Sequence, residues 1–236
     1  METTIGASII CMDHLNFERE LKFLDEASVD FLHLDVMDGR YVPRYGIYPE
    51  IVEEMSAQST IPMDLHIMAD DPLFCFKQFK HIDAIKYISV HLNGNEKEFT
   101  SIANAIKNEG KKVGIVVDLI CDLERVSDLL RAQLADSVMF MGIIPGVLKQ
   151  THRPDIMIRN FKNLQNYYPE LPNLFVQADG GVNFDILQEL QEIGINNFVC
   201  GTSTIFKNRD KLISWEENES LFENNLKTMR KELGLV

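Results

Sequence analysis

The sequence lacks the features that mark secreted, membrane-spanning or zinc-ribbon proteins. Its 236 residues include four cysteines with no Cys-x-x-Cys pair, so neither a disulfide framework nor a zinc ribbon is indicated. No apolar run approaches the roughly 18 residues needed to cross a bilayer, and the first residues lack the basic and apolar regions of a signal peptide. We therefore expect a cytoplasmic protein with no membrane contact. The scattered cysteines, expected to be buried or neutral thiols, are Cys11, Cys75, Cys121 and Cys200.

Positive charge is also scarce. The chain has 23 Lys and Arg against 36 Asp and Glu, a formal net charge of -13, and no basic cluster. Such a surface repels nucleic acid and anionic membranes, so we expect neither as a partner. A phosphorylated ligand would be repelled at long range too, and its site would have to use backbone N–H groups, a helix N-terminus or a few local cations.

The pattern of apolar residues predicts a barrel. Hydrophobic residues make up 45% of the chain, enough for one large core. Short apolar, β-branched runs alternate with amphipathic helical stretches in units of about 30 residues, with no Pro-, Gly- or Ser-rich linker. This favours a single α/β domain over residues 1–236, a (β/α)8 TIM barrel, over an open doubly wound sheet. The expected strands are Ile5–Ile10, Phe31–Val36, Met63–Met68, Ala84–His91, Lys112–Asp118, Ser137–Met141, Asn173–Ala178 and Asn197–Cys200.

Helix signals follow the expected strands. After the first strand, Phe17, Leu21 and Leu24 recur on one helical face, and Asp13 is the expected N-cap. Pro154 suits the first turn of the helix that follows the sixth strand. These signals support the alternation of strand and helix on which the fold prediction depends.

Four residues with acid–base or metal-binding side chains end three of the expected strands. His33 and Asp35 end the second strand, and because residues two apart on a strand share a face, both can point into a barrel mouth. His66 ends the third strand and Asp179 the seventh, so the four are expected to converge at the carboxyl ends of the strands. Two imidazoles and two carboxylates suit one Zn²⁺, Fe²⁺, Mn²⁺ or Co²⁺ ion and also supply two bases. The set suggests removal and return of a proton beside a carbonyl group.

Glycines follow the last two expected strands. Gly180 and Gly181 follow the seventh, and the Gly-Thr-Ser-Thr run at 201–204 follows the eighth, where it can open a short helix. In phosphate-binding barrels these two loops and a helix N-terminus hold the phosphate, since glycine lets the backbone approach the anion. The loop after the sixth strand contains Gly146 and Lys149 and is expected to fold over a ligand.

Three other polar residues lie near the expected mouth. His91, at the end of the fourth strand, is expected to make a structural hydrogen bond. For Asp38, a structural role, capping its loop or accepting a backbone N–H, and a role in the site stay open alternatives. Asp64, two residues before His66, has no role assigned by the pattern.

Taken together, these patches resemble the ribulose-phosphate 3-epimerase family, which includes the allulose-6-phosphate 3-epimerases. The most specific part is His33 to Gly39, His-Leu-Asp-Val-Met-Asp-Gly, followed by Val42-Pro43. The likeness runs from Ser8 to about Phe206. The patches that add to it are His66-Ile67-Met68, Asp179-Gly180-Gly181-Val182 and Gly201-Thr202-Ser203.

The resemblance implies a TIM barrel of the ribulose-phosphate-binding type that holds one divalent metal ion through His33, Asp35, His66 and Asp179. Asp35 and Asp179 would be the acid–base pair, working from opposite faces of the C3 atom of a 2-keto sugar through an enediolate. Three methionines would surround that intermediate or simply fill the core. These are Met37, Met68 and Met141. The implied substrate contacts are Ser8, His66, Gly146, Gly180, Gly181, Gly201, Thr202 and Ser203.

The loops that would face substrate depart from the family pattern. Where the family has Pro-Gly-Phe-Gly-Gly-Gln after the sixth strand, residues 145–150 read Pro-Gly-Val-Leu-Lys-Gln, so Leu148 and Lys149 replace two glycines. Either Lys149 compensates as a point charge or the loop has lost its phosphate role. Three further departures are His91-Leu92-Asn93 for His-x-Glu, Asp118-Leu119 for Asn-Pro, and Val42-Pro43-Arg44 for Val-Pro-Asn.

We therefore expect a metal-dependent isomerase that converts D-ribulose 5-phosphate to D-xylulose 5-phosphate, a step of the pentose phosphate pathway. The alternatives are epimerisation of allulose 6-phosphate or another hexulose 6-phosphate, and a barrel that binds sugar phosphate without turnover. An aldolase or decarboxylase is disfavoured because Lys86 and Lys112 lie at strand starts, the wrong end of the barrel. The expected partners are a small-molecule sugar phosphate and, as is common in the family, further copies of the chain.

Overall fold

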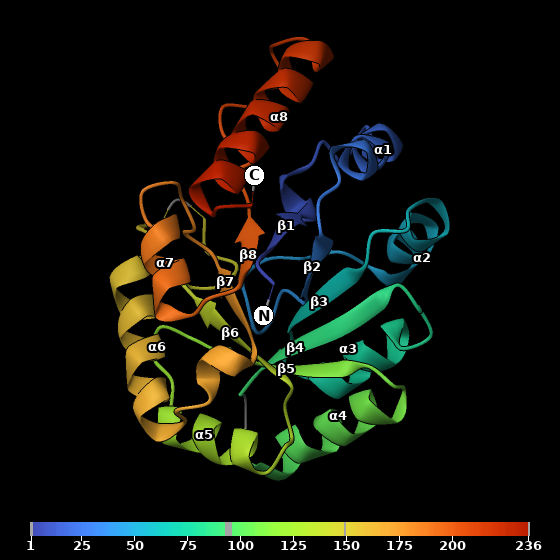
Figure 1. The fold of residues 1–236 in the computed structure, drawn as a ribbon. Helices are drawn as coiled ribbons and strands as arrows, with labels where there is room; N and C mark the ends of the chain where they lie inside the picture. Colours follow the sequence, from blue (N-terminus) through green and yellow to red (C-terminus); the bar gives the residue numbers. More distant parts are fainter. Residues whose placement is uncertain (1, 93–95, 149, 236) are drawn as a thin grey trace.

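Eight parallel strands pair in chain order and close into a barrel in the computed structural model, which describes residues 2–92, 96–148 and 150–235 (Figure 1). The last strand pairs with the first, which confirms the predicted barrel and makes the open sheet wrong. The strands are β1 (Thr4–Ser8), β2 (Phe31–Met37), β3 (Met63–Met68), β4 (Ile85–His91), β5 (Lys112–Val117), β6 (Ser137–Met141), β7 (Phe175–Asp179) and β8 (Asn197–Cys200).

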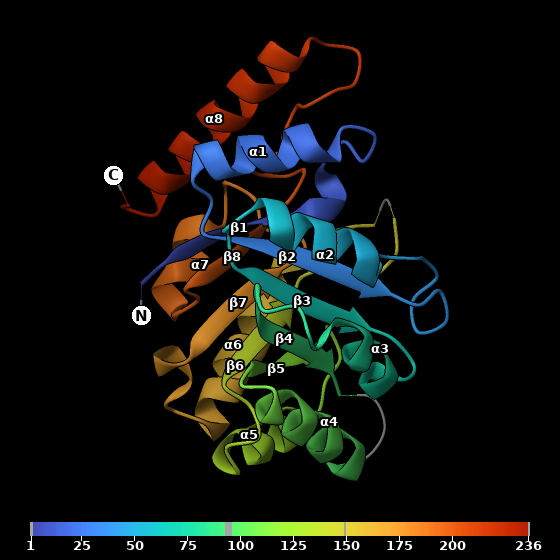
Figure 2. The same ribbon diagram turned by 90° about the vertical axis from the view of Figure 1, so that its right-hand side faces the viewer.

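Helices form a ring around the barrel, one after each strand (Figures 1 and 2). The last helix lies beside the first in both views, and the rings of Phe23 and Phe222 meet there edge to face with centroids 5.1 Å apart. The helices are α1 (Phe17–Ala27), α2 (Pro49–Gln58), α3 (Pro72–Phe79), α4 (Glu96–Asn108), α5 (Leu123–Arg131), α6 (Pro154–Tyr167), α7 (Leu187–Ile193) and α8 (Trp215–Glu232).

The strands are apolar on both faces because both faces are covered. One face fills the barrel and the other packs against the helices, and every residue of β3 and β6 is buried. Toward the carboxyl ends of the strands, Asp35 of β2 is in register with His66 of β3. On the other side, Asp179 of β7 is in register with Met141 of β6. Strand pairing therefore sets the relative heights of the site residues.

Proline and capping residues start several of the helices. Pro154 is the first residue of α6, as predicted, because its missing N–H has no partner to lose there. The side chains of Asp71 and Asp122 accept the N–H of the third residue of α3 and α5, and Ser214 forms a capping box with Glu217 in α8. These caps fix the points at which the loops of the mouth end.

Two predictions about the segment after β1 are wrong. The strand ends at Ser8, not Ile10, and a 3-10 turn over Ile9–Cys11 follows it. The N-cap of α1 is Asn16, and Asp13 instead accepts the backbone N–H of Leu15 and the side-chain amide of Asn16. The apolar residues continue past the strand because they pack in the turn, so hydrophobicity alone placed its end too late.

Two further boundaries differ near the last strands. Asn173 belongs to a 3-10 turn, η2 (Leu171–Asn173), and β7 starts at Phe175. Residues 202–208 form turns, not the short helix expected after β8. The N–H groups of both Thr204 and Phe206 bond to the carbonyl oxygen of Gly201, three and five residues back, so the i to i+4 ladder of an α-helix does not form there.

Among the described residues, no helix combines the length and the apolar character needed to cross a membrane.

Candidate active site

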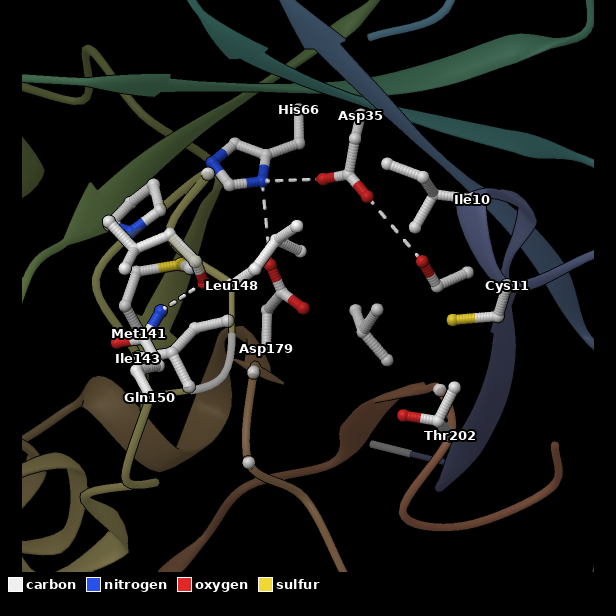
Figure 3. A pocket seen from close by; sticks show the side chains of 18 of the residues that line it. Ile10, Cys11, Asp35, His66, Met141, Ile143, Leu148, Gln150, Asp179 and Thr202 are labelled. Atoms are coloured by element: carbon white, nitrogen blue, oxygen red, sulfur yellow. Dashed lines mark hydrogen bonds and ion pairs between the residues drawn. The ribbon is translucent and has the colours of Figure 1, made fainter. Parts of the chain in front are cut away.

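The predicted histidines and aspartates meet at the carboxyl end of the barrel. His66 Nδ1 lies 3.4 Å from Asp35 Oδ1 and 3.4 Å from Asp179 Oδ2, as the dashed lines in Figure 3 show. His33 Nε2 lies 3.4 Å from Asp35 Oδ1 and 3.7 Å from Asp179 Oδ2. The four side chains come from β2, β3 and β7, and one ligand atom from each lies within 4.8 Å of all the others.

His33 is held from behind by two buried side chains. Its Nδ1 lies 2.9 Å from Asp64 Oδ2, and the same carboxylate oxygen accepts a hydrogen bond of 2.6 Å from the Gln177 amide. A carboxylate can only accept, so His33 Nδ1 carries the proton and Nε2 presents a lone pair to the cluster. Asp64, to which the sequence assigned no role, therefore orients a site residue.

His66 is held from behind by a second histidine. Its Nε2 lies 2.8 Å from His91 Nε2, and His91 Nδ1 lies 2.8 Å from Asp118 Oδ2. The two ring planes are nearly parallel, 19° apart, with centroids 5.0 Å apart. The structural hydrogen bond predicted for His91 is confirmed, and its partner is a member of the cluster.

The electrostatics of the cluster favour positive charge at its centre. Burial by itself would lower the pKa of His66, but the facing carboxylates of Asp179 and Asp35 raise it to about 9. Burial likewise opposes the effect of Asp35, Asp64 and Asp179 on His33, whose pKa is raised well above its ordinary value. Burial would raise the pKa of Asp35, but the facing His33 and His66 hold it well below its usual range.

These residues fit a divalent metal ion. His33 Nε2 and His66 Nδ1 are buried and have no hydrogen-bond partner in the described part of the chain, although both face the same two carboxylates. Buried polar atoms without a partner are costly, so a shared cation is the expected partner. Nitrogen and carboxylate ligands suit zinc and its transition-metal neighbours.

A cavity of about 620 Å³ opens above the cluster. His33 lies beneath its floor and is fully buried, whereas Asp35, His66 and Asp179 line it. Figure 3 shows Met141, Ile143 and Gln150 on one side and Cys11 and Thr202 on the other. All the substrate contacts and methionines expected from the sequence line it: Ser8, His66, Gly146, Gly180, Gly181, Gly201, Thr202 and Ser203, with Met37, Met68 and Met141.

The glycines after β7 and β8 leave space at one wall of the cavity. Gly180 and Gly181 have φ values of +74° and +81°, which side chains rarely adopt, and a Cβ at Gly180 would collide with Ile143. Gly201 has an ordinary backbone conformation, and a Cβ there would meet only the Cys11 sulfur, at 3.3 Å. Glycine at 180 and 181 is required by the turn, whereas at 201 it leaves room above the backbone.

The loop after β6 crosses the mouth toward the loop after β2. A Cβ at Gly146 would lie 2.7 Å from the Val42 side chain, so the two loops touch. Gln150 holds the loop in shape, accepting the N–H of Ile144 and donating to the carbonyl oxygens of Ile144 and Val147. Leu148 lines the cavity, while Lys149, expected as a compensating charge, lies outside the described residues.

Sequence reasoning did not select Arg44 or Cys11 as site residues, although both line the cavity. Arg44 lies in the loop after β2, and its position two residues after Val42 in the motif was the available signal. Asp38 has the structural role that was one of its two alternatives, since its carboxylate accepts the backbone N–H groups of Arg40, Tyr41 and Asp70, each at 2.8 Å.

Comparison with known proteins places the chain in a family. A model of the ribulose-phosphate 3 epimerase family matches residues 4–206. The chain belongs to the ribulose-phosphate 3-epimerase family. It is 31% identical over 212 residues to the ribulose-phosphate 3-epimerase of Helicobacter pylori, which covers 90% of this chain and 94% of that protein. The enzyme of the same name from Bacillus subtilis is 29% identical over 216 residues, 89% of this chain and 96% of the relative.

Solved structures of more distant proteins share the fold of this ribulose-phosphate 3-epimerase family enzyme. The tryptophan synthase alpha subunit of Campylobacter jejuni superposes with a TM-score of 0.65 at 13% identity, covering 97% of this chain and 95% of that one. The 3-hexulose-6-phosphate synthase of Salmonella typhimurium gives a TM-score of 0.62 at 15% identity, covering 96% and 99%. These likenesses concern the barrel alone.

Proposed function

We propose that this family member catalyses metal-dependent epimerisation at C3 of a ketose phosphate, with D-ribulose 5-phosphate and D-xylulose 5-phosphate as the pair. The observation that carries the proposal is the placement of two carboxylates, Asp35 and Asp179, about one histidine nitrogen. Asp35 Oδ1 and Asp179 Oδ2 lie at equal distances of 3.4 Å from His66 Nδ1 and come from strands on different sides of the mouth.

Epimerisation needs a proton removed from one face of C3 and another delivered to the opposite face. Two carboxylates that project from β2 and β7 into one cavity can flank a carbon atom between them, one as base and the other as acid. The low pKa of Asp35 keeps its carboxylate ionised, as a base requires, and Ser8 Oγ contacts its second oxygen at 3.4 Å. We assign no fixed order to the two residues, since the reaction runs in both directions.

His33, Asp35, His66 and Asp179 would hold the metal. When bound, the ion supplies positive charge that stabilises the enediolate oxygens and so makes the C3 proton more acidic. The protein's own contribution is orientation, since Asp64 and His91 fix which nitrogen each histidine turns to the cluster. The three methionines that line the cavity give the site an apolar, polarisable wall that keeps water from the carbanion-like intermediate.

The phosphate would bind at the wall formed by the loops after β7 and β8. Gly180, Gly181 and Gly201 line this wall and would let backbone N–H groups approach an anion, and Thr202 and Ser203 add hydroxyl donors. Such neutral donors suit a chain whose net charge is -13. Arg44 lines the same cavity and offers a positive charge to an anionic substrate.

A hexulose 6-phosphate is the second candidate substrate. Leu148 lines the cavity at a loop where the family usually has a smaller residue, and the altered wall is a reason to test sugars of both lengths. An aldolase or decarboxylase that relies on a lysine at a strand end has less support, because Lys86 and Lys112 lie near the starts of β4 and β5, at the other end of the barrel. The cytoplasmic location and the homo-oligomer stay predictions.

The test is proton exchange at C3 followed by NMR in D₂O. Metal-loaded protein would be mixed with D-ribulose 5-phosphate in one tube and D-allulose 6-phosphate in another, with a chelator-treated sample as control. We expect loss of the C3–H signal and appearance of the epimer in the metal-loaded tubes only, with the five-carbon sugar reacting faster. Exchange of the six-carbon sugar alone would assign the second candidate, and tight binding with no exchange in either tube would leave a binding protein without turnover.

A further inference from the structure

We infer that Asp118, the residue directly after β5, is a positioning residue that acts through His91 to prepare His66 for metal binding. The inference rests on the metal-dependent function proposed above. It is carried by an unbroken line of hydrogen bonds from Asp118 Oδ2 to His91 Nδ1, at 2.8 Å, and from His91 Nε2 to His66 Nε2, at 2.8 Å. The line ends at His66 Nδ1, the buried nitrogen that has no partner within the described chain.

The chemistry of the three groups allows only one direction of hydrogen bonding when His91 is neutral. A carboxylate has no proton to give, so His91 Nδ1 donates to Asp118 and His91 Nε2 keeps a lone pair. His66 Nε2 must then donate to His91, which leaves the lone pair of His66 on Nδ1. That atom faces Asp35 Oδ1 and Asp179 Oδ2 at 3.4 Å. Asp118 therefore selects the tautomer of His66 that can bind the ion.

Neighbouring groups hold His91 and the backbone of Asp118 in place. His91 is buried between the His66 ring, whose centroid is 5.0 Å away, and the Tyr41 ring, whose centroid is 5.2 Å away. The backbone carbonyl of Asp118 accepts a hydrogen bond of 3.1 Å from the Asn160 side chain on α6, which fixes the strand end. The Asp118 side chain is 29% exposed, so a charge can be kept there at low desolvation cost.

The two histidines of the cluster thus have matched supports. His33 is oriented by a buried carboxylate in direct contact, that of Asp64. His66 is oriented by a more exposed carboxylate that acts through an intervening histidine. This chain has Asp118 where the resemblance leads us to expect asparagine. An asparagine oxygen can also accept from His91, but the bond from a histidine to an ionised carboxylate is stronger. The negative charge of Asp118 therefore distinguishes the site of this chain from the pattern that the resemblance leads us to expect.

The test uses three variants of the full chain. Asp118→Asn keeps the acceptor and removes the charge, and Asp118→Ala removes both. Asp122→Asn is the matched control, because it removes one charge from the same loop and keeps the N-cap of α5, a position that asparagine fills well. Zn²⁺ affinity would be measured by competition with a chelator, and the histidine tautomers by two-bond ¹⁵N–¹H NMR correlations in the metal-free proteins at a pH where His66 is neutral.

Loss of an outer partner of a metal-binding histidine typically costs about 10- to 100-fold in metal affinity. We expect Asp118→Asn to weaken Zn²⁺ binding by about tenfold and Asp118→Ala by more, with a mixed tautomer signal for His66, while Asp122→Asn matches the parent. Zn²⁺ affinity and a His66 tautomer unchanged in Asp118→Ala would overturn the inference, and so would an equal loss in Asp122→Asn.

The outcomes also separate this inference from the proposed function. If the parent protein binds Zn²⁺ tightly and exchanges the C3 proton while both Asp118 variants bind as well as the parent, only the inference fails. If the parent binds no divalent ion, the proposed metal-dependent function fails together with it. Circular dichroism of the metal-free variants establishes whether each is folded. If Asp118→Ala does not fold, the isosteric Asp118→Asn keeps the test valid.

Discussion

Particular buried polar groups at the two ends of the barrel differ in whether they have a hydrogen-bond partner. At the end where the strands begin, Lys111 is buried and its ammonium donates to the carbonyl oxygens of Ile82 and Ile85. Asn196 there accepts from the N–H of Val176 and donates to the carbonyl oxygen of Leu174. At the other end, where the strands finish, His33 Nε2 and His66 Nδ1 face the same two carboxylates. Neither nitrogen has a hydrogen-bond partner in the described part of the chain.

The difference separates groups that stabilise the fold from groups that are kept for a ligand. A satisfied buried group contributes to stability, and its loss leaves a partner without a hydrogen bond. An unsatisfied one lowers stability unless something else binds it, so its persistence in a converging pair indicates a function. Variants at the two ends should therefore change different measurable quantities.

The largest effect is expected from Asp179→Asn at the mouth. It removes one of the two proposed bases and one carboxylate from the cluster, so we expect kcat/KM for epimerisation to fall by roughly 10²- to 10⁴-fold. The matched control is Asp136→Asn at the opposite end, where the carboxylate accepts the N–H of Val113. Coupled-enzyme kinetics would measure both variants, and near-parental turnover by Asp179→Asn would contradict the two-base mechanism.

A pair of glycine substitutions should separate an effect on substrate binding from an effect on the free energy of unfolding. Alanine fits at Gly201 except for a contact of 3.3 Å with Cys11, but its methyl group occupies the space proposed for the phosphate. The loss of one hydrogen bond to a charged group costs about 1.5 kcal/mol of binding free energy, so we expect KM to rise roughly tenfold. Steady-state kinetics measures this, and an unchanged KM would place the phosphate elsewhere in the cavity.

Its counterpart is Gly110→Ala, after α4 and just before β5 at the closed end. Gly110 has a φ of +71° and nothing within 4 Å of a built Cβ, so the only cost is the backbone conformation. We expect the free energy of unfolding to fall by about 1 kcal/mol, with no change in KM. Urea unfolding measures the first quantity, and a change in KM here would show that the two ends are coupled.

The smallest effect is expected from Lys111→Met, again at the closed end. The carbonyl oxygens of Ile82 and Ile85 lose their shared donor, which destabilises the fold. Burial lowers the pKa of Lys111, so removing the charge offsets part of that loss. We expect the free energy of unfolding to fall by roughly 1 kcal/mol, with kcat/KM within experimental error of the parent. A loss of activity without a loss of stability would contradict the division between the two ends.

Much of the site was predictable because it follows from local patterns. His33 and Asp35 share a face because they are two residues apart on a strand, and the glycines at 180 and 181 are needed for their positive φ values. The end of β1 and the start of α1 were misplaced, because Ile9 and Ile10 read as strand residues while the chain turns there. The structure of the loop after β8 depends on contacts of Arg209 with Glu20, 189 residues earlier in the chain, which no local pattern contains.

By itself, the sequence determined the closed ring of eight strand–helix units and the four residues that meet at its mouth, because hydrophobic periodicity and strand parity act over a few neighbouring residues. Which nitrogen each histidine turns to the centre follows from contacts between strands that are distant in the chain. That choice depends on Asp64 and Gln177 behind His33 and on His91 and Asp118 behind His66. These partners come from other strands, and a hydrogen bond forms only where the register of the closed sheet brings donor and acceptor within about 3 Å.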